Sequence, residues 1–136
     1  MIIGIGNDIV AINRIKKIYQ KFEYKFLEKC FDDYEIAIFN KRFTKNFNGQ
    51  INFLAKRFSA KEALVKALGI GIGRGINFKD IRIINDQFGK PEIEILNNKL
   101  SYILNKFNCQ KIKIHLSLSD TNELALAIVI IEKISD

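Results

Sequence analysis

The sequence predicts a single α+β domain in which helices pack on a small antiparallel sheet. Helical periodicity dominates the first half of the chain, whereas short strands joined by turn residues dominate the second half. No internal repeat and no linker-like composition divides the 136 residues, and a chain of this length can bury one core. We therefore expect residues 1–136 to form one domain.

The first half is predicted to be one strand followed by three helices. Ile2-Ile3-Gly4-Ile5-Gly6 predicts a strand that enters a polar turn at Asn7-Asp8, and its alternating glycines indicate a closely packed second backbone. Helical spacing of apolar residues predicts a helix from Ile12 to about Lys29. A second helix starts at Asp32-Asp33, where a carboxylate can cap the first turn. It directs Ile36 and Phe39 inward and ends near a Thr44–Gln50 loop.

The best defined helix is predicted from about Asn52 to Leu68, with Gly69 as its C-terminal cap. A glycine-rich loop follows it. The remaining elements are a hairpin, a helix and a second antiparallel strand pair, at residues 81–84 with 92–95, 97–107, and 111–119 with 124–131.

The chain is basic, with 22 Lys and Arg against 15 Asp and Glu and a net charge of +7. Such an excess suits a polyanionic or acidic partner, but charge alone does not choose between nucleic acid, membrane, phosphate-rich ligand and acidic protein. Cys30 and Cys109 have no metal-site spacing and are expected to be free thiols. The start resembles no signal peptide and no apolar run approaches roughly 20 residues, so we expect a soluble, cytoplasmic protein that contacts no membrane.

Three acidic or basic residues stand out by position. Asp8 follows a strand and suits either a hard-cation ligand or a helix cap, with the cap favoured on spacing alone. Glu62 and Lys66 share one helix face, where a solvated ion pair is the simpler interpretation. Ser59-x-x-Glu62 also matches a capping box, which would start the helix at that point.

Two further segments carry polar chemistry. The loop containing Gly71, Gly73 and Arg74 can bring backbone N–H groups to phosphate oxygens, but it follows a helix and lacks the established nucleotide-loop motifs. His115 is the sole histidine and shares a strand face with Ser117 and Ser119. That face can look into a site, although a lone strand histidine is more often structural or solvated.

Together these segments resemble the holo-acyl-carrier-protein synthase family, the small bacterial 4′-phosphopantetheinyl transferases. The resemblance runs from residue 2 to about residue 132. It rests on matching segments in the family's order: Gly6-x-Asp8-x5-Arg14-Ile15, Arg57-Phe58-Ser59-Ala60-Lys61-Glu62-Ala63-x-x-Lys66-Ala67-x-Gly69, Gly71-Ile72-Gly73-Arg74, Gly89-Lys90-Pro91 and His115-x-Ser117-x-Ser119.

The resemblance implies a magnesium-dependent transferase. It would move 4′-phosphopantetheine from coenzyme A to a serine of apo-acyl-carrier protein and release adenosine 3′,5′-bisphosphate, in fatty acid biosynthesis. Asp8 and Glu62 resemble the metal ligands, and Glu62, or a metal-bound water next to it, is the candidate base. Lys66 would steady phosphate charge and complete the catalytic set. Coenzyme A would contact Arg57, Lys66, Gly71, Gly73 and His115.

The resemblance also implies partners. A homotrimer with active sites between subunits is typical of the family. Carrier proteins are acidic, and a basic helix face suits one: Arg14, Lys17, Lys21 and Lys25. One position departs from many relatives, because Asp120 stands where they have a histidine.

Two other functions stay open at this stage. A nucleic-acid-binding module would explain the charge, but the sequence contains no recognised motif for one, and we expect no nucleic acid partner. A noncatalytic coenzyme A-binding protein would bind the nucleotide and leave the carrier serine unmodified.

Overall fold

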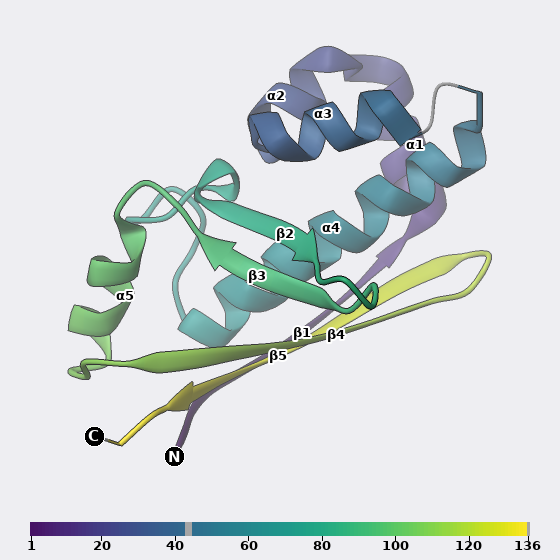
Figure 1. The fold of residues 1–136 in the computed structure, drawn as a ribbon. Helices are drawn as coiled ribbons and strands as arrows, with labels where there is room; N and C mark the ends of the chain where they lie inside the picture. The colour runs from purple at the N-terminus through teal and green to yellow at the C-terminus, as the bar shows by residue number, and fades with distance from the viewer. Residues whose placement is uncertain (43–44, 136) are drawn as a thin grey trace.

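The computed structural model describes residues 1–42 and 45–135, with helix α4 (Phe47–Leu68) at its centre. A three-stranded antiparallel sheet of order β1-β5-β4 packs along one side of α4, and a two-stranded hairpin covers another side (Figure 1). The N-terminus lies beside the end of β5, because the Met1 ammonium donates a hydrogen bond to the Lys133 carbonyl at 3.0 Å. The other elements are β1 (Ile2–Ala11), α1 (Ile12–Phe22), α2 (Tyr24–Cys30), α3 (Asp33–Arg42), η1 (Phe78–Asp80), β2 (Ile81–Asn85), β3 (Pro91–Ile95), α5 (Lys99–Lys106), β4 (Ile112–Asp120) and β5 (Leu124–Lys133).

The α+β class and the second half of the chain are confirmed. The strands β2 and β3 pair antiparallel, and β4 and β5 pair antiparallel across the turn that follows Asp120. Gly69 ends α4 in the left-handed conformation at φ 68°, as a C-terminal glycine cap requires. The alternation and turn signals of this half were therefore sufficient to place its elements.

Strand β1 and helix α4 approach each other closely, as the glycine pattern predicted. A Cβ atom added to Gly4 would overlap the Ala67 carbonyl oxygen, and one added to Gly6 would overlap that of Ala63. Only residues without a Cβ allow this contact. The predicted turn at Asn7-Asp8 is wrong, because β1 continues through both residues, paired with Ile128 and Ala127. The strand thus carries Asp8 onto the flank of α4.

The substitution Gly6→Ala is expected to lower the free energy of unfolding, because the new methyl group meets the backbone of α4 rather than a movable side chain. Overpacking of this kind costs about 1–3 kcal/mol. Thermal unfolding measures the effect. Gly71→Ala is the control, since its Cβ would meet nothing nearer than Arg74 Cδ at 3.8 Å. Equal melting temperatures for the two variants would contradict the close packing.

The predicted helix from Ile12 to Lys29 is in fact two helices. Glu23 separates α1 from α2 with φ 47°, and its N–H donates to the Tyr19 carbonyl. The turn lets Phe26 and Leu27 reach the core, where both are buried. A glutamate gives no sequence signal for a positive φ, so the apolar periodicity predicted one continuous helix.

The predicted start of α3 is confirmed as a capping box. The Asp32 carboxylate accepts from the Glu35 N–H at 3.0 Å, and the Glu35 carboxylate accepts from the Asp32 N–H at 3.1 Å. Ile36 and Phe39 are buried as expected. Of the predicted Thr44–Gln50 loop, Thr44 lies outside the described residues, and α4 already begins at Phe47, capped by the Asn46 side chain.

Two apolar clusters fill the fold on either side of the middle of α4. One is rich in phenylalanine and lies among α1, α2, α3 and the first half of α4. The other consists mainly of aliphatic residues and lies among the second half of α4, the sheet and the hairpin. Among the described residues, no helix has the length and apolar character needed to cross a bilayer.

Candidate active site

Asp8, Glu62 and Lys66 come together where β1 crosses α4. The Lys66 ammonium lies 3.1 Å from Asp8 Oδ1, and the Asp8 side chain is 13% exposed while that of Lys66 is 53% exposed. The Ser59 hydroxyl donates to the Asp8 carbonyl at 3.0 Å and fixes the strand to the helix at this residue. Lys66 therefore contacts the strand carboxylate rather than forming a simple i, i+4 pair along its own helix.

The charges of this group interact. Burial raises the pKa of Glu62, the nearby negative charge of Asp8 raises it further, and Lys66 and Arg14 partly offset both effects. A carboxylate whose ionisation is made costly by a second carboxylate nearby marks a place where a cation is stabilised. Lys66 supplies a single positive charge to Asp8 here, and all-oxygen donors of this kind suit a magnesium ion. The residues present therefore fit a divalent cation.

Both structural alternatives for these residues are wrong. Asp8 does not cap α1, because Ala11 occupies the N-cap position, and among the described residues no side chain caps that turn. Ser59-x-x-Glu62 is not a helix start, because both residues lie in the interior of α4. Their hydroxyl and carboxylate instead face β1 and the charged group beside it.

Arg57 belongs to a second polar group, on the hairpin side of α4. Its Nη2 donates to Asn85 Oδ1 at 2.9 Å, and Asn85 Nδ2 donates to the Gly89 carbonyl at 2.9 Å. The guanidinium carbon lies 3.7 Å from the centre of the Phe53 ring, and burial lowers the Arg57 pKa to about 10. Its Nε has no hydrogen-bond partner among the described residues. Asn85, the last residue of β2, connects this arginine to the Gly89-Lys90-Pro91 segment.

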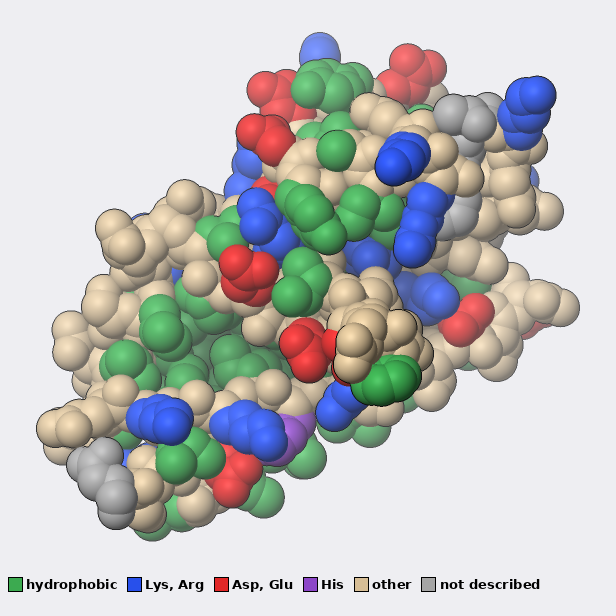
Figure 2. Space-filling view, viewed as in Figure 1, with side chains coloured by type: hydrophobic (Ala, Val, Ile, Leu, Met, Phe, Trp, Pro, Cys, Tyr) green, Lys and Arg blue, Asp and Glu red, His purple; other side chains and the backbone are tan. Residues whose placement is uncertain are grey.

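His115 lies on the opposite face of the sheet from Asp8. His115 pairs with Ile130, and Ile130 pairs with Ile5, so these three side chains share one face of the sheet. Gly6 and Asp8 have the opposite orientation along β1 and face α4. His115 Nε2 lies 2.8 Å from Glu132 Oε2, and both side chains are about 40% exposed. Figure 2 shows Lys and Arg side chains along the lower part of this view, below a hollow lined by hydrophobic groups. Within a single chain, His115 therefore lies apart from Asp8 and Glu62.

The glycine-rich loop follows directly from the turn of α4 that carries Lys66. Gly73 has φ 86°, and its N–H donates to the Ile76 carbonyl, while the Arg74 N–H donates to the Gly71 carbonyl. The Tyr102 hydroxyl donates to the Arg74 carbonyl and supports the loop from α5. Gly71 and Gly73 are exposed, so contact of this loop with a phosphate stays a prediction.

The predicted basic face spans two helices. Arg14, Lys17 and Lys21 are exposed on α1, whereas Lys25 lies beyond the break at Glu23 on α2. Lys25 lines an apolar pocket that the sequence analysis did not find. The pocket lies among α1, α2, α4 and η1, and its walls are Ile18, Phe22, Lys25, Phe26, Lys29, Cys30, Phe58 and Phe78.

Asp120, the departure from many relatives, lies 3.8 Å from the Lys56 ammonium on α4. Both side chains are about one third exposed or slightly more, so the pair contributes little to stability. It does give the Asp120 carboxylate a positively charged neighbour.

Comparisons with known proteins identify relatives of this chain. Curated holo-[acyl-carrier-protein] synthases of Ehrlichia chaffeensis and Ehrlichia canis are each 44% identical over 131 residues, which cover 96% of this chain and 97% and 94% of theirs. The crystal structure of the Neisseria meningitidis holo-[acyl-carrier-protein] synthase superposes with a TM-score of 0.84 at 38% identity, covering 98% of this chain and 100% of that one. A Bacillus anthracis holo-(acyl-carrier-protein) synthase in complex with CoA (3′,5′-ADP) gives 0.78 at 35% identity, covering 98% of each chain.

A model of the 4′-phosphopantetheinyl transferase superfamily matches residues 4–129, which include most of β1, all of α4 and the hairpin. The match agrees in extent with the relatives and with the superposed structures. Over nearly its whole length, this chain therefore belongs to the 4′-phosphopantetheinyl transferase superfamily.

Proposed function

We propose that this protein is a magnesium-dependent holo-[acyl-carrier-protein] synthase, which transfers 4′-phosphopantetheine from coenzyme A to a carrier serine. The observation that carries the proposal is the convergence of Asp8, Glu62 and Lys66 at the crossing of β1 and α4. Relatives 44% identical over nearly the whole chain are holo-[acyl-carrier-protein] synthases, and a related structure contains coenzyme A. Neither a nucleic-acid-binding module nor a noncatalytic coenzyme A-binding protein requires this carboxylate pair.

Asp8 and Glu62 would hold the magnesium ion, which when bound offsets negative charge on the pyrophosphate and on the leaving 3′,5′-bisphosphate. The carrier serine Oγ forms a bond to the β-phosphorus as the bridging P–O bond to the nucleotide breaks. Glu62 is the proposed acceptor of the serine proton. Lys66 is exposed enough to turn from Asp8 toward a phosphate oxygen.

Arg57, Gly71, Gly73 and His115 are the proposed contacts for the nucleotide and its phosphates. Arg57 is suited to a phosphate because Asn85 and Phe53 hold its guanidinium in place while its Nε lacks a protein partner among the described residues. A guanidinium held in this way loses little freedom when it binds an anion. His115 lies with Lys90 and Pro91 along the walls of one pocket.

We also propose that each active site forms between two chains of a homotrimer. The Asp8 group lies at the β1 edge of the sheet, whereas His115 belongs to β4, the opposite edge. On the face of the sheet turned away from α4, strands β1 and β5 expose several large apolar residues. These residues include Ile5 at 68%, Ile9 at 59% and Ile128 at 40%. An apolar face of this kind commonly forms an interface, which would bring one chain's β1 edge to another chain's β4 edge.

Co-production of Glu62→Gln and His115→Gln chains tests the shared site. Each variant alone is expected to lose most transfer activity, because each lacks one half of every site. Mixed oligomers contain some sites with both halves intact, so their activity should exceed that of either parent. The amide introduced by His115→Gln can keep a hydrogen bond to Glu132, which limits structural damage. Activity no higher than that of the parents, in oligomers shown to be mixed, would contradict a two-chain site.

The carrier protein is proposed to dock on α1 and on the apolar pocket beside it. Arg14, Lys17 and Lys21 would face its acidic side chains, and the phenylalanine-lined pocket would receive an apolar side chain between Lys25 and Lys29. Charge complementarity mainly raises the association rate, and burial of an apolar group in the pocket slows dissociation.

Reversal of the charge at Lys21 is expected to raise the KM for carrier protein about five- to tenfold at low salt, with less effect at high salt. The KM for coenzyme A should stay unchanged. Lys106→Glu on α5 is the matched control, because it makes the same change of charge at an exposed residue of another element. Steady-state kinetics at two ionic strengths measures both variants, and equal effects of the two would contradict the docking surface.

Mass spectrometry of apo-carrier protein tests the proposed reaction as a whole. Incubation with the protein, coenzyme A and Mg²⁺ should add the mass of one phosphopantetheine, and a carrier whose acceptor serine is replaced by alanine should gain nothing. A noncatalytic binder would bind coenzyme A and leave the carrier mass unchanged. Binding of nucleic acid as the main activity would appear instead as tight, salt-dependent association with DNA or RNA.

A further inference from the structure

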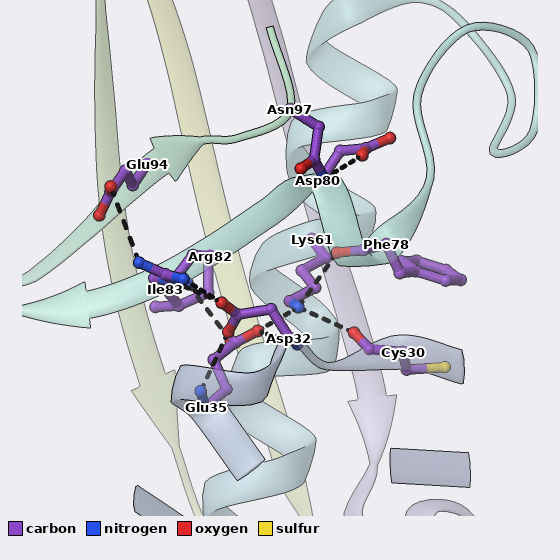
Figure 3. A network of polar contacts seen from close by, with 10 residues as sticks. All are labelled: Cys30, Asp32, Glu35, Lys61, Phe78, Asp80, Arg82, Ile83, Glu94 and Asn97. Atoms are coloured by element: carbon purple, nitrogen blue, oxygen red, sulfur yellow. Dashed lines mark hydrogen bonds and ion pairs between the residues drawn. The ribbon is translucent and has the colours of Figure 1, made fainter. Parts of the chain in front are cut away.

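Lys61 neighbours Glu62 in the sequence but faces a different part of the fold. Successive residues of a helix point about 100° apart, so the two side chains leave α4 in different directions. The Lys61 ammonium is fully buried and donates three hydrogen bonds, to Glu35 Oε1 at 2.5 Å, the Cys30 carbonyl at 2.8 Å and the Phe78 carbonyl at 3.2 Å (Figure 3). Every donor of the ammonium is therefore used.

The two carbonyls belong to different elements that line the apolar pocket. Cys30 is the last residue of α2, where backbone carbonyls lack partners within the helix, and Phe78 begins η1. Both residues line the pocket, together with Phe26 and Phe58. The Lys61 ammonium thus bonds to the backbone of two pocket-lining segments that are far apart in the sequence. Its own helix, α4, contributes Phe58 to the same pocket.

Glu35 fixes the position of the ammonium. Its Oε1 also accepts from the Asp32 N–H at 3.1 Å, and its Oε2 accepts from the Ile83 N–H at 3.3 Å. Asp32 in turn contacts Arg82, with Nε to Oδ2 at 2.6 Å. Both carboxylate oxygens of Glu35 therefore accept hydrogen bonds, and contacts with α3 and β2 hold the Lys61–Glu35 ion pair in place (Figure 3).

We infer that Lys61 is a positioning residue that sets the separation of the pocket walls, and so the fit of the carrier protein. This inference rests on the proposed docking of the carrier in that pocket. Among the described residues, none of the bonds of Lys61 reaches Asp8, Lys66 or Arg57. Loss of these bonds should therefore weaken carrier recognition and leave coenzyme A recognition unchanged.

The test is the double variant Lys61→Met with Glu35→Gln, which removes both buried charges while preserving side-chain volume. The KM for carrier protein should rise about tenfold, whereas the KM for coenzyme A should change less than about twofold. Arg82→Gln is the matched control. It removes the neighbouring Asp32 contact and lowers stability, but it leaves both carbonyl bonds in place, so its carrier KM should match that of the wild type.

An unchanged carrier KM in a folded double variant would overturn the inference, as would an equal rise in Arg82→Gln. If the double variant does not fold, Lys61→Arg is measured in its place with the same expected result, because it keeps a positive charge beside Glu35 but cannot reproduce the three bonds of the ammonium. Circular dichroism establishes folding before the kinetics. Failure of the wild-type protein to modify any carrier would instead overturn the proposed function, so the two failures are distinguishable.

Discussion

Asp8→Asn and Glu62→Gln are each expected to lower magnesium-dependent transfer at least about a hundredfold while the protein stays folded. Loss of a metal ligand removes transition-state charge stabilisation worth several kcal/mol, which corresponds to rate losses of this order. Both substitutions keep side-chain shape. Ser59 holds Asp8 through the backbone carbonyl, a bond that the Asp8→Asn substitution leaves in place. Steady-state transfer assays over a range of Mg²⁺ concentrations measure the loss.

Glu94→Gln is the matched control for Glu62→Gln. Glu94 is an exposed hairpin carboxylate whose ion-pair partner, Arg82, lies 3.9 Å away, so its loss should leave transfer near the wild-type rate. Near-normal activity in either Asp8→Asn or Glu62→Gln would refute the assignment of that residue as a ligand.

Lys61→Met alone is expected to have the largest effect on stability. Burial raises the pKa of Glu35 and lowers that of Lys61, so each charge depends on the other. Removal of one partner of a buried pair leaves an uncompensated charge and costs about 3–5 kcal/mol. Chemical denaturation measures the difference in free energy of unfolding.

The second substitution should recover much of that loss. In the double variant with Glu35→Gln, neither charge of this buried pair remains, and replacement of a whole buried pair is often close to neutral. A single variant as stable as the wild type, or a double variant much less stable than the single one, would contradict this account of the pair.

The sequence placed the regular elements of the second half well because alternation and turn residues are local signals. It misplaced the break at Glu23 and the turn at Asn7-Asp8, since an ordinary residue with positive φ and a polar residue within a strand both depend on tertiary packing. The alternating glycines of β1 did reveal the contact with α4, because a close approach of two backbones requires the absence of a Cβ.

The candidate site could be predicted only in part. Resemblance indicated Asp8, Glu62 and Lys66, and these do converge, although spacing alone favoured a cap and a surface ion pair. The separation of His115 onto the other sheet face depends on strand register, which no local pattern discloses. The pairing of Lys61 with Glu35 and the carbonyl bonds of Lys61 likewise depend on contacts between distant segments.

A crystal structure grown with coenzyme A and Mg²⁺ tests the central claim most directly. We expect one cation with an oxygen of Asp8 and an oxygen of Glu62 at about 2.0–2.1 Å, and with Lys66 moved from Asp8 to a phosphate. A cation bound elsewhere, or two carboxylates too far apart to share one, would contradict the proposal.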